Sequence, residues 1–153
     1  MNQKHGELIG IAVRAKSRGL MQEVDVAEIT IENGVMHDFR GKPGERQVTV
    51  LAAEDWDAAC SDLGKRLPWT YRRANLYVKG IKLQDAKDSI VRLGDVMLLV
   101  TGETDPCPRM DEAEPGLMSA LKPDWRGGVC CRVIRGGEIA TDMPVRIEIQ
   151  NGE

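Results

Sequence analysis

The chain has 153 residues, of which 42% are hydrophobic and 29% are charged, and its formal net charge is −3. This length predicts one domain over residues 1–153, with enough apolar side chains to form a core. The acidic balance gives no general attraction to nucleic acid or to an anionic membrane surface, so no nucleic-acid partner is expected. No apolar run approaches the roughly 20 residues of a membrane helix, and MNQKHGELIG lacks the apolar core of a signal peptide. We therefore expect no membrane association and a cytoplasmic location.

Short strand patterns dominate the chain. Residues 7–14 (ELIGIAVR) form the first apolar run, and residues 24–31 alternate with a one-residue shift at Ala27–Glu28, which indicates a β-bulge. Asn33–Gly34 is a turn dipeptide after which Val35–Met36 is expected to return as a paired strand. Further strands are predicted over residues 47–51, 75–78, 95–100, 129–134, 138–140 and 144–149. Gly136–Gly137 predicts a hairpin between the runs on its two sides.

Two helices are predicted. In residues 53–63, Trp56, Ala59, Cys60 and Leu63 have the spacing of one helix face, and Gly64 is a suitable residue for the end. A shorter helix is expected over residues 115–121, between two prolines. Many short strands with about two short helices indicate a mostly β fold, either an antiparallel barrel or a sandwich.

The four cysteines are expected to be free thiols in a reducing compartment, and their spacing does not match a structural zinc site. Cys60 lies on the apolar face of the first helix and is interpreted as a small buried hydrophobe. Cys130 and Cys131 are neighbours in a strand, so their side chains point to opposite faces. The sequence leaves open which of the two faces the core.

Cys107 stands apart from these three, in the segment TGETDPCPRM after an apolar strand. The prolines on either side restrict the backbone and present the thiol at low entropic cost. A thiolate is both a nucleophile and a soft metal ligand, and a neighbouring cation such as Arg109 favours it. The alternative is a rigid loop in which the cysteine has no chemical role.

Three further segments carry cations suited to binding an anion. Residues 37–47 contain Arg40, Lys42 and Arg46 together with two glycines. Residues 69–76 contain Arg72, Arg73 and Asn75, and residues 125–129 contain Arg126 before two glycines. Arginine binds phosphate or carboxylate with two parallel hydrogen bonds. The alternatives are a solvated basic loop, ordinary ion pairs at a strand edge, and a plain turn. No Walker A or dinucleotide-binding glycine motif is present.

Taken in order, these segments resemble the MOSC family, the domain found at the C-terminus of molybdenum-cofactor sulfurases. The resemblance spans about residues 7–147 and is carried by HDFRGKPGERQVTVL (37–51), RRANLYVKGIKL (72–83), RLGDVMLLVTGETDPCPRM (92–110) and RGGVCCRVIRGGEIATDMPV (126–145). Arg73 and Asn75 match the family's R-x-N signature, and Cys107 matches its lone loop cysteine. The chain resembles a small standalone member, without the aminotransferase-like domain of larger relatives.

The resemblance implies a MOSC-type β-barrel and a pocket for the molybdenum cofactor (molybdopterin), a pterin that bears a phosphate. It implies that Cys107 is either a molybdenum ligand or a carrier of persulfide sulfur. Arg73 and Asn75 are then cofactor-binding residues, and Arg72, Arg40, Lys42 and Arg126 lie in matching basic segments. Three readings remain open: a cofactor-dependent reductase with a redox partner protein, a sulfur-transfer module supplied by a cysteine desulfurase, and a non-catalytic cofactor carrier.

Overall fold

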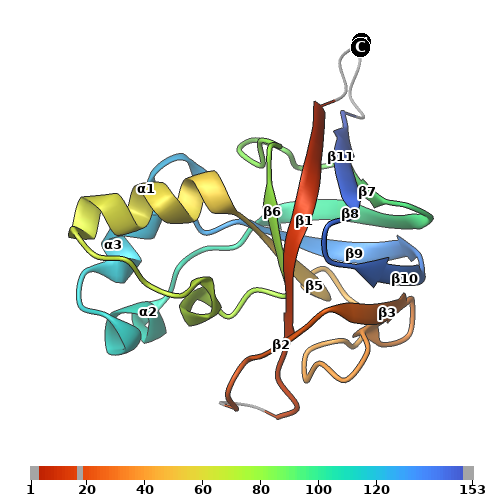
Figure 1. Cartoon of the computed structure of the whole chain (residues 1–153), viewed down its shortest axis with the longest axis horizontal. Coiled ribbons are helices and arrows are strands. Elements are labelled where there is room, and N and C mark those ends of the chain that lie inside the picture. The colour runs from red at the N-terminus through yellow and green to blue at the C-terminus, as the bar shows by residue number, and fades with distance from the viewer. Residues whose placement is uncertain (1–3, 17–18, 150–153) are drawn as a thin grey trace.

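The computed structural model describes residues 4–16 and 19–149, and it shows a β-barrel with helices packed beside it (Figure 1). The strands are β1 (Lys4–Val13), β2 (Gln22–Val24), β3 (Val26–Thr30), β4 (Gly34–Val35), β5 (Val48–Ala52), β6 (Leu76–Lys79), β7 (Ile90–Leu93), β8 (Val96–Glu103), β9 (Val129–Arg135), β10 (Gly137–Ala140) and β11 (Pro144–Glu148). The helices are α1 (Ala53–Leu63), α2 (Pro108–Ala113) and α3 (Leu117–Leu121), with 3-10 turns η1 (Trp69–Arg72) and η2 (Pro123–Trp125). The prediction of a mostly β barrel is confirmed, with one more helix than expected.

Seven strands close the barrel in the order β11-β7-β8-β9-β5-β6-β1, because β1 also pairs with β11. This closing pair joins the first and last strands, with Lys4 opposite Ile147. β2 extends the sheet beyond β1, and β10, β3 and β4 form a second, three-stranded sheet. Alternating inward side chains such as Leu8, Val78 and Leu98 fill the barrel and are completely buried.

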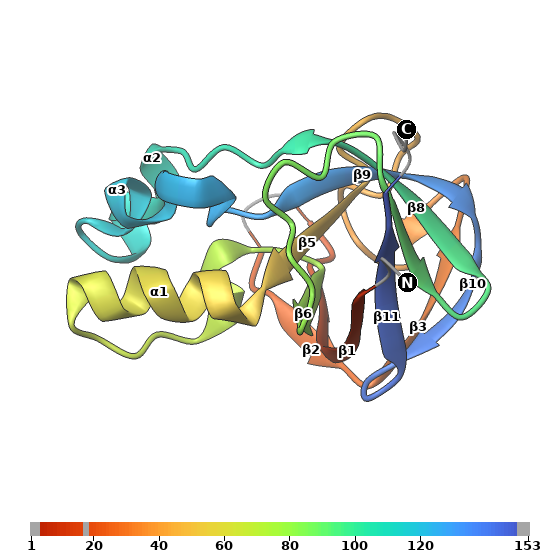
Figure 2. The same cartoon turned by 90° about the horizontal axis from the view of Figure 1, so that it is seen from above.

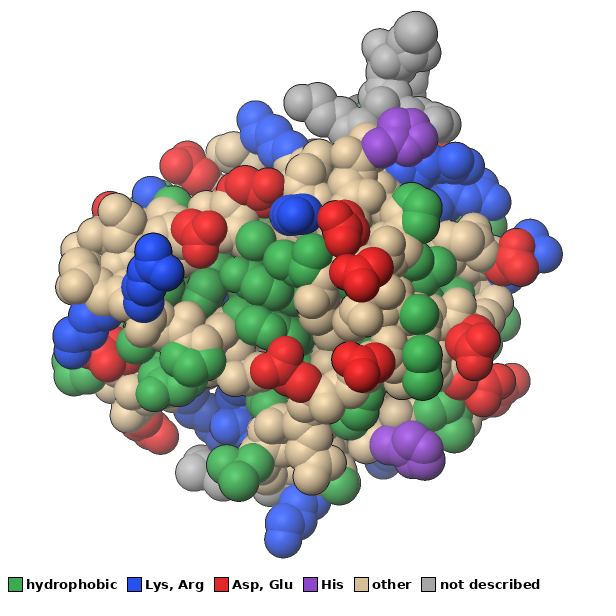
Figure 3. Space-filling view, in the orientation of Figure 1, with side chains coloured by type: hydrophobic (Ala, Val, Ile, Leu, Met, Phe, Trp, Pro, Cys, Tyr) green, Lys and Arg blue, Asp and Glu red, His purple; other side chains and the backbone are tan. Residues whose placement is uncertain are grey.

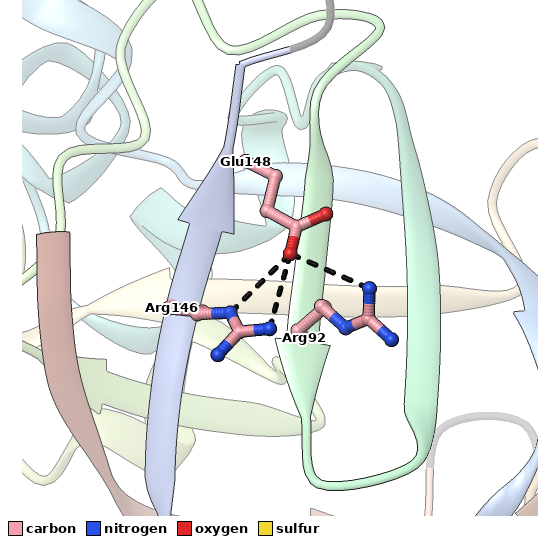
Figure 4. Close-up of polar contacts among 3 residues, drawn as sticks. All are labelled: Arg92, Arg146 and Glu148. Carbon is pink, nitrogen blue, oxygen red and sulfur yellow. Dashed lines mark hydrogen bonds and ion pairs between the residues drawn. The ribbon is translucent and has the colours of Figure 1, made fainter. Parts of the chain in front are cut away.

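Charged side chains also join two of the neighbouring barrel strands. The carboxylate of Glu148 on β11 accepts a hydrogen bond from Arg146 on the same strand and from Arg92 on β7 (Figure 4). The distances from Glu148 Oε2 are 3.3 Å to Arg146 Nε and 3.4 Å to Arg92 Nη1. These part-exposed contacts reinforce the pairing of Arg146 with Arg92 in the sheet, and each contributes modestly.

The three helices pack together on one side of the barrel (Figure 2). α1 begins and ends where the sequence predicts, buries Trp56, Ala59 and Cys60, and ends at Gly64, whose left-handed backbone (φ 67°) allows the end of the helix. The Trp56 indole donates to the carbonyl of Leu67 at 2.9 Å, so its one polar group is satisfied. α3 lies inside the predicted range, and α2, directly after Cys107, was not predicted.

The predicted Gly136–Gly137 hairpin is wrong. β9 pairs with β5 and β8 in the barrel, whereas β10 pairs with β3 in the small sheet, so the chain passes from one sheet to the other here. A Cβ on Gly136 would lie 2.4 Å from the carbonyl oxygen of Ile29. The glycine therefore permits a close crossing over β3 instead of a turn. β7 was also missed, and it pairs with β8 across Gly94–Asp95.

The sequence had left open which of the two neighbouring cysteines of β9 faces the core. Cys131 is completely buried inside the barrel, and burial raises the pKa of its thiol. Cys130 faces the other side and is also buried, with its sulfur 3.1 Å from Thr104 Oγ1. No helix in the described part of the chain is long and apolar enough to cross a membrane.

Candidate functional site

A cavity of about 230 Å³ lies where the ends of several strands meet α2, and it is rich in arginine. We call it the basic pocket and define it by its charged lining residues and one thiol: Arg14, Asp38, Arg40, Arg46, Arg72, Arg73, Asp105, Cys107 and Arg109. Thr49, Asn75, Thr104 and Gly127 are among its other lining residues. The fold thus brings together residues from distant parts of the sequence around one thiol.

Cys107 is the exposed thiol of the pocket, and the other three cysteines are buried. It has an extended backbone (φ −127°, ψ 171°) and immediately precedes α2, which Pro108 begins. Proline is suited to this first position because its missing N–H would have no partner within the helix. The Cys107 carbonyl accepts from Met110 N at 2.9 Å, so the helix fixes the backbone that presents the thiol.

Arg72 is buried, with 7% of its surface exposed, and its guanidinium is held by the protein. Nε donates to the carbonyl of Gly127 at 3.0 Å, and Nη2 donates to the carbonyl of Thr104 at 2.8 Å. Nη1 lies 3.8 Å from the sulfur of Met110. Arg72 therefore joins three segments around the pocket, on both sides of Cys107 in the sequence. Burial lowers the pKa of Arg72, while Cys107 and Cys130 act in the opposite direction.

Arg73 follows η1 in a left-handed backbone conformation (φ 68°), which non-glycine residues adopt uncommonly. Its Nη2 donates to the carbonyl of Gly19 at 2.8 Å. Asn75 is buried, and its side-chain oxygen accepts from Thr49 N at 3.1 Å while its amide donates to the carbonyl of Ala12 at 3.2 Å. Asn75 thus fixes β1 against β5 at the wall of the pocket.

Arg14 is a pocket residue that the sequence interpretation missed. It follows β1 directly, is only 7% exposed, and its Nη1 is buried with no hydrogen-bond partner among the described residues. Burial lowers the pKa of Arg14, and the neighbouring charges of Arg73, Arg40 and Arg109 lower it further. The sequence feature that could have identified Arg14 is its position at the end of an apolar strand pattern. A cation at that position lies next to the core and needs a polar environment.

Asp38 places Arg14 and Arg40 beside each other. Its two carboxylate oxygens accept separately, from Arg14 N at 3.0 Å and from Arg40 N at 3.2 Å. The Phe39 backbone N–H donates back to the carbonyl of Arg14 at 2.7 Å. The Asp38 carboxylate thus uses both oxygens on backbone donors, and it does not pair with the guanidinium of either arginine.

Two sequence-predicted cations do not line the basic pocket. Lys42 is exposed on the loop between Arg40 and Arg46, both of which do line it. Arg126 pairs with Asp62 at 2.6 Å and donates to the carbonyl of Ala120 at 2.9 Å, so it joins the helices to each other. The remaining predicted residues, Arg40, Arg72, Arg73, Asn75 and Cys107, all meet at the pocket.

A second, more open cavity of about 840 Å³ lies beside α1 and contains none of the predicted cofactor residues. Its walls include Trp56 and the stacked rings of Trp69 and Tyr77, whose centroids are 4.7 Å apart. Hydrophobic side chains gather beside α1 on the face shown in Figure 3. Nothing in the described residues joins this groove to the chemistry of Cys107.

The described residues contain no group of three or more His, Cys, Asp or Glu side chains that is arranged to hold a metal ion. Cys107 can supply one soft ligand, and the guanidinium groups can bind an anion. The arrangement therefore suits a metal that arrives within an anionic organic ligand, or a sulfur atom carried on the thiol. It does not suit a metal ion held by the protein alone.

Comparison with known proteins gives one family and one fold. The model of the MOSC domain family matches residues 15–146. The crystal structure of YuaD from Bacillus subtilis is similar, with a TM-score of 0.84, 19% identity, and coverage of 98% of this chain and 99% of that one. YiiM from Escherichia coli has a TM-score of 0.71 at 15% identity, and YiiM from Geobacillus stearothermophilus has 0.75 at 15%. These alignments cover 96% and 93% of this chain, and 72% and 74% of the two YiiM chains. No curated protein matches the sequence.

Proposed function

Because the chain belongs to the MOSC domain family, a family associated with the molybdenum cofactor, we propose that its basic pocket binds this cofactor with Cys107 at the metal or sulfur end. The observation that carries the proposal is the convergence of six arginines and one exposed thiol on a single cavity. Arginine guanidinium groups suit the phosphate of a pterin, and an exposed thiol suits a soft metal or a sulfur atom.

The residues present fit such a group. Arg14 has a buried Nη1 without a partner among the described residues, and an anionic oxygen would remove this unfavourable state. Cys107 is accessible and lies on a backbone that α2 and the Arg72 contacts hold in place. In this proposal Arg14, Arg40, Arg73 and Arg109 orient the phosphate, Asn75 maintains the wall, and Cys107 presents its sulfur.

When bound, the cofactor supplies the two-electron chemistry of molybdenum, and the protein supplies binding and orientation. In this first reading the chain is a cofactor-dependent reductase, and electrons have to come from a redox partner protein. Arg72 then keeps the segment that carries Cys107 at a fixed position relative to the arginines that hold the phosphate. The fold then sets the distance between the Cys107 thiol and the phosphate.

The second reading is sulfur transfer, and the exposure of Cys107 favours it. The Cys107 thiolate attacks the terminal sulfur of a persulfide on a cysteine desulfurase, the S–S bond of the donor breaks, and the donor thiolate leaves. The sulfur then stays on Cys107 as a persulfide until an acceptor takes it. A carrier that holds the cofactor without reaction is the third reading.

The test is to make the protein in a host that produces the molybdenum cofactor and to measure molybdenum, pterin and persulfide in the purified chain. Stoichiometric molybdenum and pterin that are lost in Cys107→Ala support metal ligation. A persulfide adduct on Cys107 after incubation with a desulfurase, without bound metal, supports sulfur transfer. If the wild-type protein binds no cofactor and accepts no sulfur, the proposal is wrong.

A further inference from the structure

We propose that the basic pocket binds two phosphate-type oxyanions at once, one against Arg14 and the other against Arg46 on the Cys107 side. This rests on the proposed function only in its assignment of the first anion to the phosphate of the cofactor. The second anion is then a negatively charged group of the substrate. Anion binding itself can be measured without the cofactor.

The charge of the pocket exceeds what one phosphate can balance. Its six arginines and two aspartates leave a formal charge of +4. One phosphate monoester carries about −1.5 to −2 near neutral pH, so two such groups carry about −3 to −4 together. The volume of about 230 Å³ is several times the roughly 30 Å³ share of one water molecule. Both charge and space therefore accommodate a second anion.

The first subsite is built around Arg14. Arg14 is over nine-tenths buried, and its buried Nη1 has no acceptor among the described residues. Arg73, Arg40 and Arg109 are its positively charged neighbours, and Asp38 is the negative one. The Asp38 carboxylate accepts two backbone N–H groups, and it makes no hydrogen bond to the guanidinium of Arg14 or Arg40. An external anion is the remaining acceptor for Arg14 Nη1.

The second subsite is the part of the pocket lined by Arg72, Arg46 and Cys107, with Asp105 as the acidic residue among its lining. Arg72 gives Nε and Nη2 to the carbonyls of Gly127 and Thr104. Arg46 is exposed, and its guanidinium makes no hydrogen bond or ion pair to another described residue. Its loop is attached to the barrel where Thr101 Oγ1 donates to the carbonyl of Glu45. The backbone next to Arg46 is thus attached to the barrel, and its side chain lines the pocket with its donors available.

The experiment is a titration of the purified full chain, made in a host that lacks the cofactor, with inorganic phosphate at constant ionic strength. Arginine Nε–H signals in nitrogen–proton NMR spectra report each binding event. Two groups of signals are expected to shift with separate dissociation constants. Arg14→Met should weaken the first event about tenfold or more, and Arg46→Gln should weaken the second about tenfold or more. Arg66→Met, an exposed arginine outside the pocket, is the matched control and should change neither.

A repeat with pyrophosphate identifies the source of the two anions. If one pyrophosphate displaces both phosphates, the subsites are close enough for one ligand with two linked groups. If it displaces only one, the pocket takes two separate anions. Both results support two subsites, whereas a single binding event, or none, overturns the inference. Should Arg14→Met misfold, Arg40→Gln on the exposed loop tests the first subsite instead.

The experiments distinguish a failure of the two-subsite proposal from a failure of the proposed function. A chain that loads molybdenum and pterin but binds a single phosphate disproves two subsites and leaves the cofactor proposal in place. A chain that binds two phosphates, but takes up neither cofactor nor persulfide in any preparation, disproves the proposed function alone.

Discussion

The guanidinium of Arg72 donates a 2.8 Å hydrogen bond to the carbonyl oxygen of Thr104, shortly before Cys107 in the chain. This contact changes the expected role of Arg72. The sequence resemblance placed Arg72 among residues that bind the cofactor, but Nε and Nη2 are used on backbone carbonyls. We therefore propose that Arg72 positions the segment that presents the thiol.

Replacing Arg72 with Met should lower the free energy of unfolding by about 3 kcal/mol, because two buried carbonyl oxygens lose their donors. Chemical denaturation measures this change, with Arg66→Met as a control expected to stay within about 0.5 kcal/mol. The rate of Cys107 alkylation at fixed pH should also change as its segment moves. Wild-type stability together with a wild-type alkylation rate would show that Arg72 does not hold this segment.

Gly127→Ala tests the same contact without removing a charge. A Cβ at this position would lie 2.4 Å from the Thr104 carbonyl oxygen and 3.0 Å from Arg72 Nη2. The backbone has to shift, and we expect a loss of about 1–3 kcal/mol in the free energy of unfolding. Gly102→Ala is the control, since a Cβ there meets no atom within 4 Å. Equal stability of the two variants would contradict the close approach.

Arg14→Met should make the protein more stable when no anion is present. The replacement removes a buried guanidinium nitrogen without a partner and fills the space with an apolar side chain, so a gain of about 1 kcal/mol is expected. In excess phosphate the order should reverse, because the wild type gains more stability from bound phosphate than the variant, whose first subsite is weakened. Thermal unfolding with and without phosphate measures both effects, and a variant that is less stable under both conditions would show that Arg14 already has its partner.

Native alkylation should modify one cysteine. Cys107 is exposed, whereas Cys60, Cys130 and Cys131 are buried, and the raised pKa of Cys131 further suppresses its thiolate. Iodoacetamide followed by mass spectrometry should show a single adduct, absent in Cys107→Ala. That variant should unfold within about 0.5 kcal/mol of the wild type because its side chain is exposed. A second adduct formed at a similar rate would mean that one of the buried cysteines is accessible in the native protein.

Asp55 gives a pH dependence of stability. Burial raises the pKa of Asp55 to about 6, and the nearby Glu54 adds to the effect. In the unfolded chain an aspartate titrates near pH 3.9, so the native state holds the extra proton between about pH 4 and 6. The contribution of Asp55 to the free energy of unfolding should therefore fall as the pH rises through this range. The residue is only half-buried and sits in the first turn of α1, where the helix dipole favours its charge, so we expect a contribution of about 1 kcal/mol.

Asp55→Asn is the matching variant for this measurement. It should flatten the decrease between about pH 4 and 6 and be more stable than the wild type at neutral pH. Urea unfolding across the pH range gives the comparison. If the difference in free energy of unfolding between the wild type and Asp55→Asn rises through this interval, the pKa of Asp55 is lowered instead.

The local parts of the fold were predictable from sequence. The bounds of α1 follow from the spacing of Trp56, Ala59 and Cys60 and from Gly64, since a helix end depends on adjacent residues. The partner of β10 did not follow, because pairing with β3 instead of β9 depends on where the barrel places distant segments. Gly136–Gly137 has the composition of a turn, but Gly136 serves a close crossing over Ile29.

The candidate site was predictable in its residue types and not in its arrangement. Arg40, Arg73 and Cys107 were singled out because cations and a constrained thiol have recognisable chemistry, and the fold places all three at the pocket. In the sequence Arg14 is only the last residue of a predicted strand. Its place in the pocket depends on contacts that form when the chain folds. Arg126 has the same local character as the others, yet it pairs with Asp62 between helices.

The pairing of β1 with β11 has a consequence for synthesis of the protein. The strands that close the barrel are the first and the last along the described chain, so the ring cannot close on the ribosome before β11 emerges. Until then β1 presents an open edge, with hydrogen-bonding groups that another nascent chain can occupy. Contacts between residues so far apart in sequence also slow folding. During synthesis, the aggregation-prone period of this chain therefore ends when β11 is complete and pairs with β1.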